Sequence, residues 1–184
     1  MSFIDKIILK LVKTRDLDHE KELTLLKSII NSLPDMLWAK SVDGSYIYAN
    51  KSIIDKLLFS ETLENTIDRR DAELALERRK AVGNENHTFG EICGNSDYVI
   101  LETEKPERFL EFGKVDGKDM YLEVHKDILR DKEGNIIGTV GTGRDITQDY
   151  KDLKGLVNNI DDLTKDEIKE TLEKLIHRHF YAGD

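Results

Sequence analysis

The stretch that decides the fold runs from residue 129 to residue 147 and reads LRDKEGNIIGTVGTGRDIT. Residues that favour extended structure flank the turn sequence Lys132–Asn135, which predicts two antiparallel strands joined by a hairpin. Toward the N-terminus, Met120–Arg130 and Arg108–Val115 have the same character and are separated by the turn residues Asp116-Gly117. With Asn135–Thr147, they predict three consecutive antiparallel strands in the last third of the chain.

Two shorter strands are predicted further upstream, at Met36–Lys40 and Ser45–Ala49, around the tight-turn sequence Val42-Asp43-Gly44. Between these two strands and the last three, helical periodicity predicts short helices. They lie at Ile53–Leu58, Asp71–Val82 and from Asn95 or Ser96 to Glu104. The order of elements predicts an α+β fold with one five-stranded antiparallel sheet and short helices on one face.

Amphipathic helices are predicted at both ends of the chain. Phe3–Val12 and Leu23–Leu33 precede the first strand, and Leu153–Ile160 and Ile168–Ile176 follow the last one. We therefore expect an N-terminal helical extension over 1–34, a core over 35–147 and C-terminal helices over 148–184. Lysines beside the apolar stripe of Phe3–Val12 leave two alternatives open, a face for a partner helix or a segment lying on a membrane surface.

Composition excludes several classes of protein. The chain has 184 residues and a net charge of −9, which argues against a nucleic-acid partner because phosphate contacts need a basic surface. Its single cysteine excludes a disulfide framework, and no Cys/His cluster has the spacing of a metal site. No apolar run approaches the roughly 20 residues of a membrane-spanning helix. We expect a cytoplasmic protein.

Three stretches, in this order and spacing, resemble the PAS domain of bacterial signalling proteins over about residues 24–148. They are Ile30–Asp35 with Asp43-Gly44 and Tyr48–Asn50, then Leu101–Pro106 with Arg108-Phe109, and then the closing hairpin 129–147, which ends on a PAC-type Asp145-Ile146-Thr147. The resemblance implies a sensory module that binds a small ligand and dimerises through flanking helices. It implies an output in a partner protein or in a part of the polypeptide beyond Asp184, such as a kinase of a two-component system, a cyclase, a chemoreceptor or a transcriptional regulator.

Comparison with the family places one set of side chains on the pocket face of the sheet. Its members are Trp38, Lys40, Leu110, Phe112, Leu122, Val124, Thr139, Gly141 and Gly143. Glycines at alternating positions would leave room beneath the sheet. An indole beside an ammonium group suits a small anion with an apolar body, and without a ligand Lys40 needs a neighbouring carboxylate such as Glu102. The alternative is a structural adaptor whose pocket is filled.

The end of the last strand is the expected place of signal relay. The resemblance puts the change from strand to signalling helix at Arg144, Asp145 and Thr147. An aspartate at that junction can cap the outgoing helix and thereby fix its direction.

Neither a cofactor nor catalysis is expected. Cys93 lacks the Asn-Cys-Arg motif of flavin-binding family members, and no histidine lies between Asp97 and Glu104, where haem-binding members have one. Haem binding would therefore depend on His87, in the loop upstream. An enzyme using Lys40 or His87 as a base would need a second titratable partner, and none stands at readable spacing.

Overall fold

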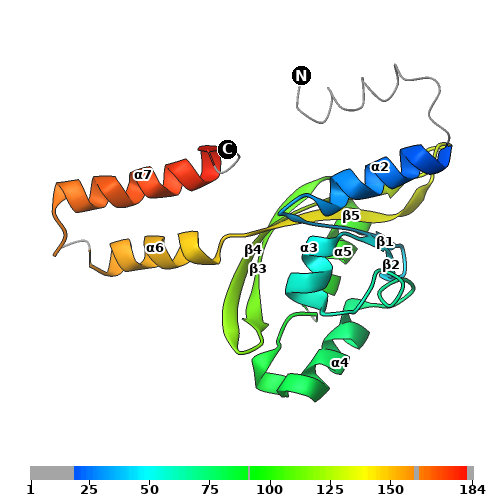
Figure 1. Cartoon of the computed structure of the whole chain (residues 1–184), viewed down its shortest axis with the longest axis horizontal. Helices are drawn as coiled ribbons and strands as arrows, with labels where there is room; N and C mark the ends of the chain where they lie inside the picture. Colours follow the sequence, from blue (N-terminus) through cyan, green and yellow to red (C-terminus); the bar gives the residue numbers. More distant parts are fainter. Residues whose placement is uncertain (1–18, 91, 160–161, 182–184) are drawn as a thin grey trace.

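Five strands form one antiparallel sheet in the order β2-β1-β5-β4-β3 (Figure 1). The computed structural model describes residues 19–90, 92–159 and 162–181. The strands are β1 (Met36–Ser41), β2 (Tyr46–Ala49), β3 (Glu107–Val115), β4 (Lys118–Arg130) and β5 (Ile136–Asp145). The predicted α+β fold is confirmed, and the last strand lies in the centre, between β1 and β4.

Short helices separate β2 from β3 and cover one face of the sheet (Figure 1). They are α3 (Lys51–Ile53), the π-helical turn η1 (Ile54–Leu58), α4 (Asp71–Val82), the 3₁₀ turn η2 (Asn84–Asn86) and α5 (Ile92–Thr103). Asn50 caps α3 by accepting a hydrogen bond from the Ile53 N–H at 3.2 Å, as predicted. Gly83 ends α4, also as predicted.

Two boundaries differ from the predictions for local reasons. Helix α5 begins at Ile92 rather than near Asn95, because Gly90, with φ of 113°, turns the chain just before it. Strand β5 ends at Asp145 rather than Thr147. There the Thr147 hydroxyl accepts a hydrogen bond from the Tyr121 N–H at 3.0 Å, and the helix begins.

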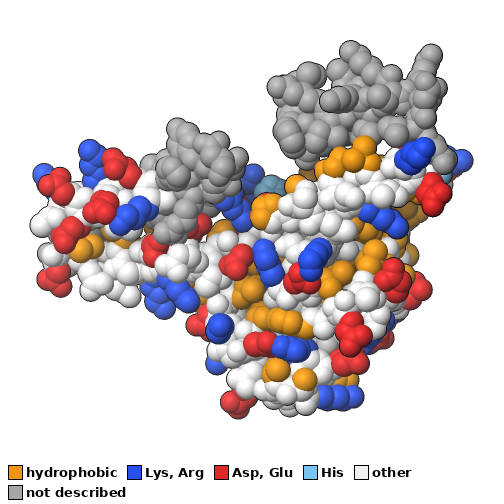
Figure 2. Space-filling model, viewed as in Figure 1, with side chains coloured by type: hydrophobic (Ala, Val, Ile, Leu, Met, Phe, Trp, Pro, Cys, Tyr) orange, Lys and Arg blue, Asp and Glu red, His pale blue; other side chains and the backbone are white. Residues whose placement is uncertain are grey.

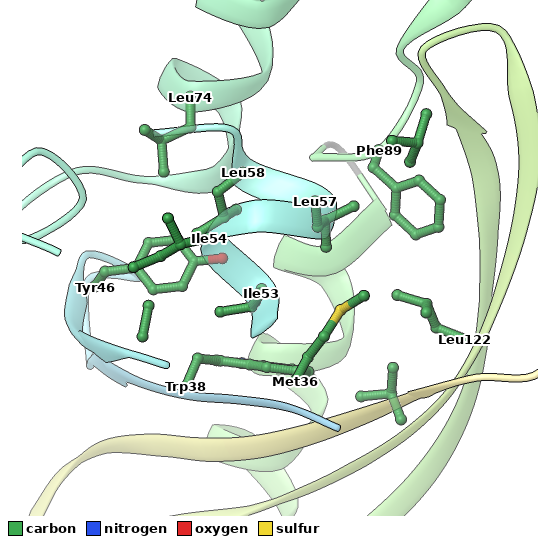
Figure 3. Packing of buried hydrophobic residues seen from close by; sticks show 13 residues of the cluster. Met36, Trp38, Tyr46, Ile53, Ile54, Leu57, Leu58, Leu74, Phe89 and Leu122 are labelled. Carbon is green, nitrogen blue, oxygen red and sulfur yellow. The ribbon is translucent and has the colours of Figure 1, made fainter. Parts of the chain in front are cut away.

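The apolar core lies between the helices and the inner face of the sheet (Figure 3). Met36 and Trp38 from β1 meet Leu122 from β4 and Phe89 from the loop before α5. Side chains of α3 and η1 close the core from the other side, at Ile53, Ile54, Leu57 and Leu58. All of these side chains are less than a tenth exposed.

Helices flank the core at both ends. α2 (His19–Asn31) joins the core where the Asn31 side chain accepts a hydrogen bond from the Lys51 N–H. α6 (Thr147–Asn158) and α7 (Lys165–Tyr181) pack on each other and extend away from the core (Figure 1). The predicted capping box at Thr164 and Glu167 is present. The predicted helix Phe3–Val12 lies outside the described residues.

No helix in the described ranges 19–90, 92–159 and 162–181 is long and apolar enough to cross a bilayer.

Candidate functional site

Trp38 lies across the central strand at the middle of the inner face. In the sheet register Gly141 is opposite both Trp38 of β1 and Lys126 of β4. A Cβ atom added at Gly141 would lie 2.5 Å from the Trp38 ring, and one at Gly143 would lie 3.2 Å from it. The glycines therefore leave room above the sheet, as expected, and the indole fills it.

Two lysines and three carboxylates form a buried cluster beside this ring. It comprises Lys40 of β1, Asp71 of α4, Asp97 of α5, Glu111 of β3 and Lys126 of β4, and we call it the interior charge cluster. Every member is less than a tenth exposed. Buried charges are stable only when they are paired and hydrogen-bonded, and here each of them is.

Asp97 is the centre of the interior charge cluster. One of its oxygens, Oδ2, is 2.8 Å from Lys40 Nζ, and the other, Oδ1, is 2.8 Å from Lys126 Nζ. Thr139 of β5 donates a longer hydrogen bond to Oδ1, at 3.4 Å. A single carboxylate of α5 thus connects the helix to the two strands that flank β5.

The other members of the cluster make further ion pairs and hydrogen bonds around Asp97. Lys40 also pairs with Asp71, whose second oxygen accepts a hydrogen bond from the Tyr46 hydroxyl at 2.5 Å. Lys126 donates to the Ser96 hydroxyl at 2.7 Å, and Ser96 donates to Glu111 at 2.7 Å. Lys40 was expected to have a neighbouring carboxylate such as Glu102. Its partners are instead Asp71 and Asp97, and Glu102 is exposed.

Electrostatics hold the centre of the cluster ionised. Burial raises the pKa of the Asp97 carboxyl, but the charges and hydrogen bonds of Lys40 and Lys126 outweigh it and hold this pKa below its ordinary value. Counted as two lysines and three carboxylates, the cluster has a formal charge of −1. A free anion-binding ammonium at Lys40, as the sequence suggested, is not what the structure contains.

One polar atom beside the cluster has no hydrogen bond. Trp38 Nε1 is buried and has no partner among the described residues, while Lys126 Nζ lies 5.8 Å from the centre of the ring. Buried polar groups without partners are rare in folded proteins, and a bound ligand or water is a common reason for them.

The expected inward orientation of Leu110 and Phe112 is wrong. Leu110 is 56% exposed and Phe112 57% exposed, on the outer face of β3. The inward residues of this strand are Phe109, Glu111 and Val115. The hydrogen bond from Ser96 to Glu111 fixes that orientation. The other members of the predicted set, Leu122, Val124 and Thr139 among them, are buried on the inner face.

His87 lies outside the interior charge cluster, against the Phe59 ring and near the charges of Asp116, Arg78 and Arg79. Its side chain is 2% exposed, and Nδ1 has no partner in the described part of the chain. Burial lowers the pKa of the imidazole. A haem does not fit here, because the adjoining space measures about 10 Å³, whereas pockets for ligands of that size take several hundred. Cys93 belongs to α5, but its side chain falls outside the described residues.

Asp145 contacts the start of α6. Its Oδ1 accepts hydrogen bonds from the Thr147 N–H at 2.9 Å and from the Thr147 hydroxyl at 2.5 Å. Across the sheet, Arg144 pairs in register with Glu123 of β4. The Asp145 carboxylate therefore links the end of β5 to the first residue of α6.

Sequence reasoning missed Asp71, Ser96, Asp97, Glu111 and Lys126. Lys126 could have been found, because it follows Leu122 and Val124 at the same alternate positions of β4. The other four depend on contacts between segments that are far apart in the sequence. Among the described residues, no three His, Cys, Asp or Glu side chains come together to hold a metal ion.

A central antiparallel sheet with helices on one face and a charged interior beneath α5 make a small α+β module. The family model for the PAS fold matches residues 30–151. This chain belongs to the PAS fold family.

Three solved structures with the same fold are a bacterial VqmA, a phage VqmA and a light-oxygen-voltage receptor. A VqmA dimer of Vibrio cholerae is 24% identical, with a TM-score of 0.53 over 66% of this chain and 50% of that one. A phage VqmA–DPO complex is 17% identical, with a TM-score of 0.54 over 77% and 60%. An RNA-binding light-oxygen-voltage receptor is 14% identical, with a TM-score of 0.53 over 91% and 41%.

This chain spans about half the length of the first structures it matches. No curated protein matches the sequence.

Proposed function

We propose that this chain is a sensory and signal-relay module that binds a small molecule at the interior charge cluster and catalyses no reaction itself. The observation that supports this most is the position of Asp97. Its carboxylate bonds to lysines of β1 and β4, the two neighbours of the strand that continues into α6. A ligand that competes for Asp97 would change the contacts on both sides of β5.

The relay step follows from the connection between β5 and α6. A change in the position of β5 reaches Asp145, which holds the first residue of α6. A ligand shifts such an equilibrium only by as much as it prefers one arrangement over the other. We place the sensory core at 35–147 and the relay and dimerisation helices at 1–34 and 148–184.

The proposed output partner is a protein rather than nucleic acid. The complexes of VqmA with DPO and with DNA concern that protein. In this chain the net charge is −9, and Figure 2 shows acidic and basic side chains interspersed over the visible face, without a basic stripe. Binding to DNA depends on clustered Lys and Arg.

Hydrogen exchange on the full chain tests the relay. Asp97→Asn removes the charge that both lysines share, and we expect faster exchange in α6 than in the wild type. Asp127→Asn, on the exposed face of β4, is the matched control and leaves α6 unchanged. Should Asp97→Asn fail to fold, Glu111→Gln removes a peripheral charge of the cluster instead. Unchanged exchange in α6 of a folded cluster variant would overturn the relay.

A structural adaptor is the second candidate function. The observation that favours it is the filling of the space over Gly141 and Gly143 by Trp38. Native mass spectrometry of the purified protein separates the two candidates. A bound small molecule supports the sensor, and a bare chain whose α6 does not respond to cluster variants supports the adaptor.

A further inference from the structure

A groove leads from the surface to the interior charge cluster. It has a volume of about 420 Å³ and lies between the β1–β2 turn, the start of α4, Gly90 and α5. Val42, Ala72, Tyr98 and Leu101 supply apolar surface along its walls. Its volume is that of a site for a small organic molecule, and apolar walls with a few polar groups are typical of such sites.

Two residues of the cluster, Asp71 and Asp97, are among those that line this groove. A carboxylate offers about four acceptor positions. Asp71 accepts hydrogen bonds from Lys40 and Tyr46, and Asp97 accepts from Lys40, Lys126 and Thr139. Both therefore keep acceptor capacity, and the formal charge of the cluster is −1. Arg70 also lines the groove, and its guanidinium is paired with Asp43 at 3.0 Å. A ligand that donates hydrogen bonds and carries positive charge complements the two carboxylates.

A second, independent feature lies behind the groove. Asp71 and Gly90 also border a small void of about 10 Å³, which His87 lines from the other side. Nδ1 of this side chain is buried and has no hydrogen-bond partner in the part of the chain that the structure describes. The void has room for about one water molecule, which needs polar partners such as a carboxylate and an imidazole. The void that shares Asp71 and Gly90 with the groove is thus lined by a buried nitrogen that lacks a partner among the described residues.

Gly90 permits this close arrangement. A Cβ atom there would lie 2.5 Å from Ala75 Cβ and 3.1 Å from the Asp71 carbonyl oxygen. Only glycine lets the chain pass so close to α4 at the point where groove and void meet.

We propose that the groove binds a small organic cation, whose ammonium or amidinium group donates hydrogen bonds to Asp71 and Asp97. Its apolar body lies against Val42, Tyr98 and Leu101, and a water between Asp71 and His87 completes the site. Tyr98 is 64% exposed, so its ring face is available for stacking or for contact with the cation. This inference rests on the proposed function, since it assigns the ligand class of the same cluster, and it replaces the anion that the sequence suggested.

Calorimetry on the full chain tests the charge of the ligand with three probes of similar size. They are 2-phenylethylammonium, 2-phenylacetate and 2-phenylethanol, which carry a positive, a negative and no charge. We expect the ammonium probe to bind at least tenfold tighter than the other two at constant ionic strength. Tighter binding of phenylacetate would overturn the charge assignment, and no binding of any probe at millimolar concentration would overturn the proposal.

Two tryptophan substitutions test the place of binding. Leu101→Trp fills the groove, and Leu110→Trp adds the same side chain to the exposed outer face of β3. We expect at least a tenfold loss of affinity for the ammonium probe in Leu101→Trp and none in Leu110→Trp. Equal affinity in both would place the probe elsewhere. Asp71→Asn, which keeps the shape of the floor, should weaken binding by a similar factor.

The two proposals fail in different ways. If 2-phenylethylammonium binds in the groove but hydrogen exchange in α6 does not change, the site is correct and the relay is wrong. If α6 responds to Asp97→Asn while no cationic probe binds, the relay is correct and the ligand class is wrong.

Discussion

At Gly141 the absence of a side chain determines whether Trp38 can lie flat on the central strand. We predict that Gly141→Ala destabilises the protein by about 1–3 kcal/mol, because the added methyl group would overlap the indole ring. The measurement is chemical denaturation followed by circular dichroism.

The matched control for this substitution is Gly155→Ala. Gly155 lies in α6 with nothing within 4 Å of an added Cβ atom. Alanine favours a helix over glycine by about 0.5–1 kcal/mol, so this variant should be equally or more stable than the wild type. A stable Gly141→Ala protein would show that Trp38 does not occupy this position in solution.

The ionised state of Asp97 should make the free energy of unfolding depend on pH in the acidic range. Its pKa in the folded protein is held below the ordinary value of about 3.9, so its ionised form contributes stability above that pH. This contribution is lost as the pH falls through the lowered folded pKa. The free energy of unfolding should therefore decrease from about pH 5 toward pH 3, more steeply in the wild type than in Asp97→Asn.

Some acid dependence should remain in that variant. Side-chain hydrogen bonds lower the pKa values of Asp43, Asp116 and Asp131 as well. At pH 7 Asp97→Asn should cost about 3–5 kcal/mol, the usual penalty for breaking a buried ion pair. Equal slopes in wild type and variant between pH 5 and pH 3 would contradict the ionised state of Asp97.

The third strand shows where sequence reasoning reaches its limit. In β3, whose sequence is ERFLEFGKV, both sets of alternate residues contain apolar side chains. The set with Leu110 and Phe112 was predicted to face inward, but it faces outward. Glu111 points inward because Ser96 and Lys126 meet it there. Alternation defines the two faces of a strand, but partners from distant segments decide which face is buried.

Among the elements, the junction of β5 and α6 yields the next prediction. Asp145→Ala removes the acceptor for the Thr147 N–H and hydroxyl, so the first turn of α6 should exchange its amide hydrogens faster while the core remains protected. Substitution of the exposed Asp162 by alanine is the control. Unchanged protection of residues 148–158 in Asp145→Ala would remove the relay role of this residue.

The boundaries of helices were predictable where a capping residue lies at the boundary. Asn50 before α3, Gly83 after α4 and the capping box at Thr164 are such local signals. The π-helical turn η1 was not predictable. It ends at Phe59, whose φ of 52° is unusual for a bulky residue, and the Phe59 ring contacts Arg78 and His87, which lie further along the chain.

For the whole molecule, we predict a dimer held by the flanking helices. Leu153 and Val157 of α6 are 44% and 64% exposed, and Leu23 and Leu26 of α2 are 46% and 41% exposed. Apolar stripes of this kind are typical of association surfaces. Light scattering should give twice the chain mass of 21.2 kDa at micromolar concentration.

A charge on the apolar face of α6 should weaken this dimer. Val157→Glu introduces it there, and Lys151→Glu, at an exposed position on another side of the same helix, is the control that leaves the apolar face intact. A monomeric wild type at high micromolar concentration, or equal dissociation of both variants, would contradict an interface through α6.

The interior charge cluster also constrains how the sequence can diverge. Loss of Lys126 alone leaves Asp97 and Glu111 with too few positive partners, whereas replacing several members together by apolar residues need not be costly. Single substitutions in the cluster are therefore selected against. Related sequences should instead replace several cluster residues together. In an alignment of homologous sequences, we expect covariation among positions 40, 71, 97, 111 and 126, although up to 86 residues separate them.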